Sequence, residues 1–80
     1  MKRKPPETPE LRQILGRTIK LYRARRGLSQ RDLAALASTT QSRVAGIELG
    51  NTSTTIDLLE RIAAGLQVNP WRLLHPDESN

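Results

Sequence analysis

Apolar residues recur at three- and four-residue steps between residues 10 and 26, which is the spacing of one face of an α-helix. The inward set that this spacing defines is Leu11, Ile14, Leu15, Ile19 and Tyr22. Gly27 follows the last of them and suits the left-handed position just after a helix C-terminus. The pattern therefore predicts a first helix over residues 10–26.

Two short helical patterns come next, separated by only a few polar residues. Ser29 with Asp32 three positions later is a capping-box signature, and it predicts a helix over residues 30–37. Thr40 caps a third helix that ends at Gly50. Two helices joined by so short a turn form a helix-turn-helix, in which the N-terminal end of the second helix can enter a DNA major groove.

Two further helical segments complete the chain. Thr54 and Asp57 repeat the capping signature. They open a helix whose expected inward face is Ile56, Leu59, Ile62, Ala63 and Leu66. Pro70, in the first helical position after Asn69, starts a last turn that contains Trp71, Leu73 and Leu74. Because no segment alternates apolar and polar residues as strands do, the sequence predicts an all-α domain of five helices.

The length of 80 residues leaves room for one small domain with a single core. Residues 1–9 contain three of the five prolines and a basic cluster, which indicates a flexible arm. We expect the folded domain over residues 10–75 and a flexible tail over residues 76–80. No apolar run approaches the roughly 20 residues of a membrane span or resembles a secretory signal, so we expect a soluble, cytoplasmic protein.

Several classes of chemistry are disfavoured. The chain has no cysteine and one histidine, so it offers neither a disulfide framework nor a zinc-ligand cluster. His75 has no second ligand and no paired nucleophile, and we expect it at the surface. A glycine-rich phosphate loop and a Ser-His-Asp constellation are also missing. We therefore expect a protein that is not an enzyme and that needs no cofactor or metal.

Charge is distributed unevenly along the chain. Residues 1–43 contain eleven Lys and Arg against three acids, whereas residues 44–80 contain two against five. A concentration of cations in one half is typical of a surface that binds a polyanion such as DNA. The alternative is that arginines on amphipathic helices only keep a small domain in solution.

A set of residues at fixed spacing spans about residues 14–74. It consists of Leu15, Gly16, Ile19, Arg23, Gly27, Leu28, Ser29, Gln30, Leu33, Ala34, Val44, Ile47, Glu48, Gly50, Leu59, Ile62, Ala63, Leu66 and Val68. In these positions the chain resembles the lambda-repressor and Cro family, also called the XRE family. The resemblance implies a five-helix DNA-binding domain, usually homodimeric, that recognises an operator with two-fold symmetry. Small controller proteins of restriction-modification systems and compact phage-type repressors are of this kind.

The resemblance also assigns roles to individual residues. Gln30 would bind a backbone phosphate at the start of the second helix. Gln41, Ser42 and Arg43 would face base edges, where Gln suits adenine and Arg suits guanine. The alternative is that these are ordinary solvated helix residues. The complete expected DNA-binding set is Gln30, Arg31, Thr40, Gln41, Ser42, Arg43, Gly46, Asn51, Thr52 and Ser53.

Arg23 and Glu48 would form an ion pair that joins the first helix to the end of the third, the alternative being two separately solvated charges.

Two positions depart from the family pattern. Ser38 stands where glycine usually supplies a left-handed turn, at a cost on the order of 1 kcal/mol. Gly46 interrupts the third helix and costs about 0.8 to 1.0 kcal/mol relative to alanine. It either allows close approach to DNA or means that no base is recognised from this position, and we favour the second interpretation.

Trp71 with Leu74 forms a candidate dimer interface, since tryptophan is enriched at interface hot spots. Equally, Trp71 could close the bottom of the core.

The expected partners are double-stranded DNA and a second copy of the chain, with RNA polymerase or a toxin protein as further candidates. Lys2, Arg3 and Lys4 form either an arm that reaches a DNA groove or a disordered cloud of charge. The alternative function is an antitoxin or other protein-interaction module in which DNA binding is secondary.

Overall fold

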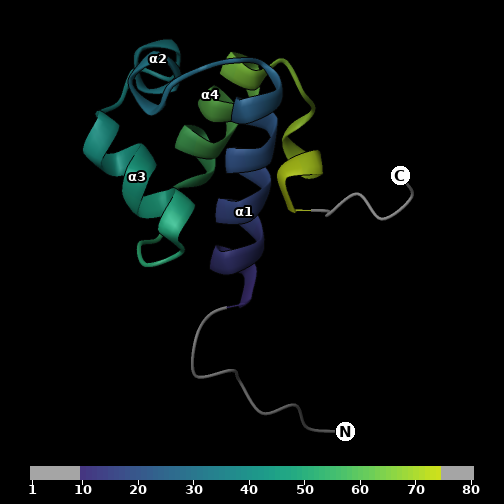
Figure 1. Ribbon diagram of the computed structural model, residues 1–80. Coiled ribbons are helices and arrows are strands. Elements are labelled where there is room, and N and C mark those ends of the chain that lie inside the picture. The colour runs from purple at the N-terminus through teal and green to yellow at the C-terminus, as the bar shows by residue number, and fades with distance from the viewer. Residues whose placement is uncertain (1–9, 75–80) are drawn as a thin grey trace, which may run out of the picture.

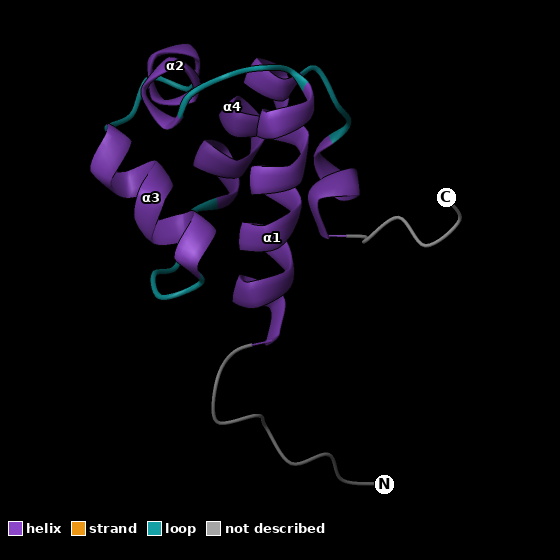
Figure 2. Cartoon of the chain, viewed as in Figure 1, coloured by secondary structure: helices purple, strands orange, loops and turns teal. Residues whose placement is uncertain are grey.

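The computed structural model describes residues 10–74, which form four α-helices and a 3-10 turn (Figure 1). In chain order these are α1 (Glu10–Arg25), α2 (Gln30–Leu36), α3 (Gln41–Leu49), α4 (Ile56–Leu66) and the 3-10 segment η1 (Pro70–Leu74). The described part of the chain contains no strand (Figure 2), so the predicted all-α class is confirmed. None of its helices is both long enough and apolar enough to cross a bilayer.

The predicted count of five helices is wrong. The last segment spans only five residues and is a 3-10 turn. Its first bond runs from the Arg72 amide to the Asn69 carbonyl, a three-residue step, at 3.0 Å. The expectations for residues 1–9, for His75 and for the tail lie outside the described residues.

One hydrophobic core receives side chains from all five elements. The buried apolar residues are Leu15, Ile19, Leu33, Ala34, Ala37, Val44, Ile47, Leu58, Ile62, Ala63, Leu66 and Leu73. α1 packs against both α3 and η1, and α2 packs against α3 and α4. Leu11, which was expected to face inward, is 59% exposed because it borders an open groove instead of the core.

The N-terminus of α2 has the predicted capping box. The Asp32 amide donates to the Ser29 hydroxyl oxygen at 2.9 Å, and the Ser29 amide donates to Asp32 Oδ2 at 3.0 Å. Hydrogen bonds from Ser29 stabilise the ionised carboxylate and therefore lower the pKa of Asp32 below its ordinary value. This cap fixes the point at which the helix-turn-helix begins.

The start of α4 differs from the prediction by one residue. Thr55, not Thr54, is the N-cap, and its hydroxyl oxygen accepts a hydrogen bond from the Leu58 amide at 3.0 Å. Leu58 consequently enters the core, while Ile56, expected inside, is 77% exposed. Residues 52–55 are all Ser or Thr, each of which can cap a helix, so the local sequence does not distinguish among them.

The turn between α2 and α3 retains a left-handed residue even though that residue is serine. Ser38 has φ 56° and is exposed. A long-range bond supports the turn, because Arg61 Nε of α4 donates to the Ala37 carbonyl oxygen at 2.8 Å. The turn therefore keeps its left-handed geometry, and contacts with a distant part of the chain offset the conformational cost of a non-glycine residue at this position.

The C-terminal end of α3 touches the backbone of α1 at Gly16. A Cβ atom at this position would lie 2.5 Å from the Ile47 carbonyl oxygen and 2.6 Å from that of Glu48. Both contacts are with backbone atoms, so any larger residue would force the two helices apart. Gly16 thus sets the distance between α1 and α3.

An ion pair reinforces this crossing. Arg23 Nε lies 2.6 Å from Glu48 Oε2, and Arg23 Nη2 lies 3.0 Å from Glu48 Oε1. The side chain of Arg23 is 15% exposed and that of Glu48 is 3% exposed. The bonds to Glu48 raise the pKa of Arg23 above its ordinary value, although burial opposes this effect. Arg23 Nη1 also donates to the Leu28 carbonyl at 2.9 Å, which joins the pair to the start of the helix-turn-helix.

We predict that Ser38→Gly raises the free energy of unfolding by about 0.5 to 1 kcal/mol, because glycine adopts a positive φ without a Cβ clash. The measurement is the urea midpoint at constant m-value. Ala35→Gly is the matched control, since it puts glycine in the exposed face of α2 and should cost about 1 kcal/mol. A loss of stability in Ser38→Gly would contradict strain at this turn.

We predict that Glu48→Ala lowers the free energy of unfolding by about 3 kcal/mol, since it leaves the Arg23 guanidinium largely buried without its partner. Glu60→Ala removes an exposed carboxylate from α4 and should change stability by no more than about 0.5 kcal/mol. In urea denaturation, the double variant Arg23→Ala/Glu48→Ala should lose less than the sum of the single variants. Simple additivity would show that the two charges act independently.

Candidate nucleic-acid interface

The first turn of α3 presents a row of polar side chains to solvent. Gln41, Ser42 and Arg43 are all exposed, whereas Val44 and Ile47 on the opposite face are 1% exposed each. The hydroxyl oxygen of the N-cap, Thr40, accepts a hydrogen bond from the Arg43 amide at 3.1 Å. α3 therefore has one face fixed in the core and a polar tip directed outward, as the sequence predicted for a recognition helix.

The N-terminus of α2 lies beside α3 but is engaged with the protein more closely than expected. Gln30 is partly buried, and its side-chain Nε2 donates to Glu48 Oε1 at 3.0 Å. Glu48 thus accepts hydrogen bonds from both Arg23 and Gln30. One of the two amide N–H donors of Gln30 is used within the protein, so this residue orients α2 on α3 in addition to any contact it makes with a ligand.

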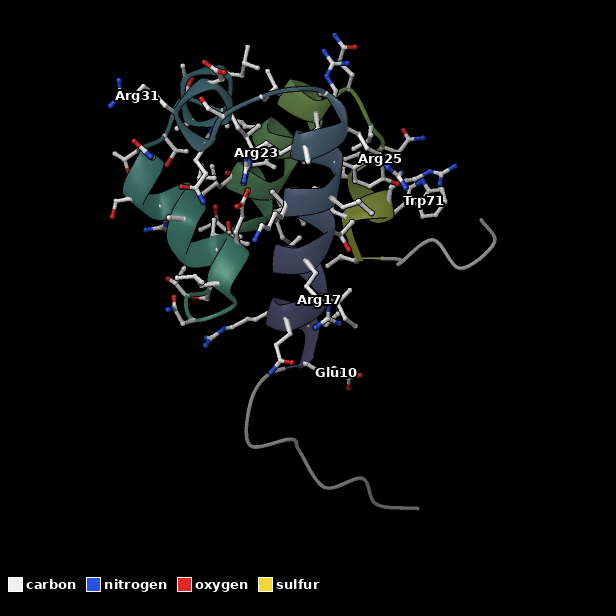
Figure 3. All side chains as sticks on the ribbon, in the orientation of Figure 1. Glu10, Arg17, Arg23, Arg25, Arg31 and Trp71 are labelled. Carbon is white, nitrogen blue, oxygen red and sulfur yellow. The ribbon has the colours of Figure 1, made fainter. Side chains whose placement is uncertain are left out.

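Arg31, the next residue, projects away from the molecule on the side of α2 and α3 (Figure 3). Neither Arg31 nor Arg43 forms an ion pair within the described residues, where Arg23 and Glu48 supply the only salt bridge. Two guanidinium groups are consequently available on this side of the domain. Exposed arginines of this kind can bind phosphates or guanine edges.

The loop after α3 packs against this helix at Gly46. Asn51 and Ser53 of this loop are exposed, and Thr52 is partly buried. A Cβ atom at Gly46 would lie 3.0 Å from Thr52 Cγ2. The glycine therefore makes room for the loop, which neither of the interpretations drawn from the sequence anticipated.

η1 lies on the flank of α1 opposite α3 (Figure 1). Trp71 is 55% exposed and Leu74 is 37% exposed, whereas Leu73 between them is fully buried. The guanidinium of Arg72 lies 5.5 Å from the centroid of the Trp71 ring. Leu73, and not Trp71, closes the core, so the core-closing alternative for Trp71 is wrong.

The ten expected DNA-binding residues thus lie on α2, at the N-cap of α3, on α3 itself and in the loop that follows, and Gly46 makes room for that loop. The residues that sequence reasoning missed are those with distant partners, such as Arg61 with Ala37. Within residues 10–74, no group of three His, Cys, Asp or Glu side chains could hold a metal ion.

Comparison with known proteins assigns the family. The HTH_3 family model, a helix-turn-helix, matches residues 19–70. A hypothetical transcription factor from Neisseria meningitidis serogroup B is 29% identical over 73 residues, which cover 91% of this chain and 69% of the relative.

Two crystal structures show the same fold. That of the hypothetical transcription factor NHTF from Neisseria has a TM-score of 0.83 at 26% identity, and the match covers 99% of this chain and 91% of NHTF. That of the restriction-modification controller protein C.AhdI from Aeromonas hydrophila has a TM-score of 0.76 at 29% identity, with 78% of this chain and 94% of C.AhdI covered. Since the family match spans more than half of the chain, the protein belongs to the HTH_3 helix-turn-helix family of DNA-binding transcription regulators, which are not enzymes.

Proposed function

We propose that the chain is a sequence-specific transcriptional regulator that binds a palindromic operator as a homodimer. The observation that carries this proposal is the outward polar turn of α3, where Gln41, Ser42 and Arg43 are exposed while Val44 and Ile47 anchor the helix in the core. A rigidly held helix with a polar tip can present side chains to base edges in a fixed register.

Different residues have different roles in this proposal. Gln41 and Arg43 form paired hydrogen bonds with adenine and guanine, and each good pair discriminates between bases by about 1 to 3 kcal/mol. Ser42 donates or accepts as the base requires. The remaining contacts go to phosphates and sugars, and they come from Gln30, Arg31, Thr40, Asn51, Thr52 and Ser53. Gly46 recognises no base, because Thr52 lies next to the position that a side chain at residue 46 would occupy.

Similarity to restriction-modification controller proteins supports the proposal that this chain is a transcriptional regulator. Besides C.AhdI, the controller protein C.Esp1396I is 31% identical with a TM-score of 0.73, and the match covers 80% of this chain and 86% of that one. The relatives named here give no support to a toxin or RNA polymerase as partner, and no observation favours an antitoxin.

The dimer interface that we propose includes Trp71 and Leu74. α1 and η1 pack together and expose large apolar side chains, among them Leu11 and Leu21 at 59% and 47% exposure. Exposed apolar side chains gathered on adjoining elements indicate a protein contact surface. A self-association surface here lies on the flank away from α3, so it leaves the recognition helix free for DNA.

We predict that Arg43→Ala weakens binding to the operator about 5- to 150-fold and changes binding to unrelated DNA far less, since it removes a base contact. The operator is first obtained by selecting bound fragments from random DNA, and affinity is then measured by fluorescence anisotropy. Arg26→Ala, which removes the same charge from an exposed residue just beyond the end of α1, is the control. An equal loss on every duplex would make Arg43 a phosphate contact, and a wild-type protein that binds no duplex at low salt would refute the proposed function.

We predict that Trp71→Ala sediments as a monomer at concentrations where the wild-type protein is a dimer, because truncation of a central aromatic residue removes most of the contact energy. Leu36→Ala is the matched control, since Leu36 is equally exposed but lies on α2. Sedimentation velocity distinguishes the two variants. If Trp71→Ala remains dimeric, the interface lies elsewhere.

A further inference from the structure

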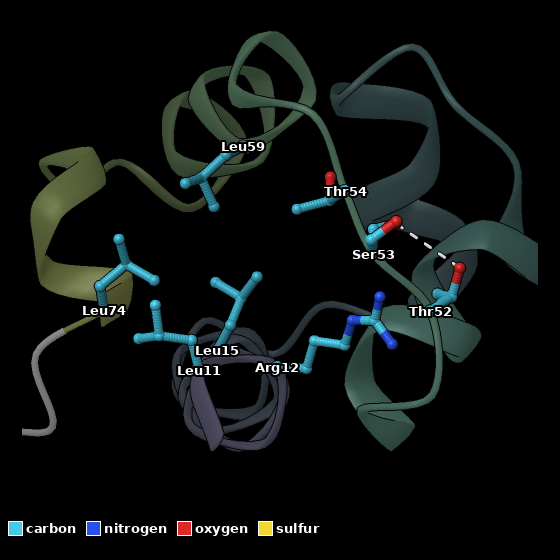
Figure 4. Close-up of a pocket in the computed structure, with 8 residues that line it drawn as sticks. All are labelled: Leu11, Arg12, Leu15, Thr52, Ser53, Thr54, Leu59 and Leu74. Atoms are coloured by element: carbon cyan, nitrogen blue, oxygen red, sulfur yellow. Dashed lines mark hydrogen bonds between the residues drawn. The ribbon is translucent and has the colours of Figure 1, made fainter. Parts of the chain in front are cut away.

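A groove of about 210 Å³ opens between α1, the loop after α3 and the C-terminal part of the domain (Figure 4). One end of it is apolar and is lined by Leu11, Leu15, Leu59 and Leu74. The other end is polar and is lined by Arg12, Thr52, Ser53 and Thr54. The side chain of Arg12 extends from α1 toward Ser53 and Thr52 (Figure 4).

No carboxylate of residues 10–74 forms an ion pair with Arg12. Arg12 is partly buried and forms no ion pair or hydrogen bond within the described residues. The facing loop, residues 51–55, has the sequence Asn-Thr-Ser-Thr-Thr and contains no acidic side chain. Glu10, at the start of the same helix, points away from α3 (Figure 3), and Glu48 is bound to Arg23. A guanidinium beside hydroxyl groups and without a carboxylate is suited to an anion.

The same loop lacks a cation of its own. If the loop lies along the DNA backbone, as the proposed function requires, its hydroxyl groups donate hydrogen bonds but neutralise no phosphate. Arg12 is the cation that the fold places next to it. The 40-residue separation between Arg12 and Thr52 explains why the charge pattern of the loop gives no hint of this arrangement.

Arg12 is also held in register with the recognition helix. Gly50, the left-handed C-cap of α3, lies so close to α1 that a Cβ atom there would be 3.5 Å from the Arg12 carbonyl oxygen and 3.4 Å from Gln13 Cα. The backbone from which Arg12 projects therefore contacts the end of α3 directly. The position of the Arg12 backbone relative to α3 is therefore fixed by this contact.

We propose that Arg12, with Thr52 and Ser53, forms a phosphodiester-binding site that extends the DNA contact beyond the recognition helix. This inference rests on the proposed function. The Arg12 guanidinium donates to two oxygens of one backbone phosphate, and the Ser53 hydroxyl donates to the same or the adjacent phosphate. The Thr52 hydroxyl, which donates to the Ser53 carbonyl at 3.5 Å in the free protein, exchanges this long bond for one to the phosphate. The site supplies affinity and register without recognising sequence.

The test compares Arg12→Gln with Arg17→Gln in the full chain. Arg17 is an exposed arginine of the same helix that projects away from the loop, so its replacement removes the same charge outside the site (Figure 3). Affinity for the selected operator and for an unrelated duplex is measured over a series of salt concentrations. In Arg12→Gln both affinities should fall by the same factor, and the slope of log K against log salt should become shallower by about 0.9. Arg17→Gln should keep the wild-type slope.

Arg12→Lys distinguishes loss of the charge from misfolding of the variant. It retains a point charge, so it should keep the salt slope while losing part of the affinity. If Arg12→Gln matches Arg17→Gln, the site is refuted, although wild-type binding to the operator would still support the proposed function. A wild-type protein that binds no duplex would refute both. The Arg12 Nε resonance should shift with operator DNA but not with equimolar inorganic phosphate at the same ionic strength. A shift with phosphate alone would assign the site to a free anion and overturn the proposal.

Discussion

The fixed distance between α1 and the end of α3 is the constraint on which the remaining geometry depends. At Gly16 the two backbones approach so closely that no Cβ atom fits, and Glu48 beside this contact accepts hydrogen bonds from Arg23 and Gln30. The backbone contact at Gly16 thus sets the distance between α1 and α3, and the hydrogen bonds to the Glu48 carboxylate set the orientation of α3 relative to its neighbours. Because Arg23 belongs to α1 and Gln30 to α2, one buried side chain holds three helices in a single orientation.

This arrangement explains how so small a domain can project a rigid helix. α3 has only nine residues, too few to be stable by itself, and its last turn supplies much of its attachment. The first turn is then free to be polar, since it is not needed for packing beyond Val44. The buried residues that attach α3 and its exposed polar residues thus lie toward opposite ends of the helix, and the loop after it is placed by the anchored end.

Local sequence features were sufficient wherever the signal and its partner lie within one or two turns. The capping box at Ser29, the glycine after α1 and the amphipathic face of α1, with the exception of Leu11, were predicted correctly for this reason, and with them the all-α class. The start of α4 was misplaced by one residue because residues 52–55 are four possible caps in a row. Contacts between distant residues, such as Arg61 with Ala37, Gly46 with Thr52 and Arg12 with the loop, have no local signature and required the fold.

The contact between Gly46 and Thr52 also constrains how the binding preference of this protein can diverge. A side chain added at position 46 would meet the methyl group of Thr52 before it reached a ligand. An additional determinant on this turn of α3 therefore requires the Thr52 side chain to move aside, so a substitution at position 46 is coupled to the conformation of the loop. Divergence through Gln41, Ser42 or Arg43 meets no such obstacle, since their side chains are exposed.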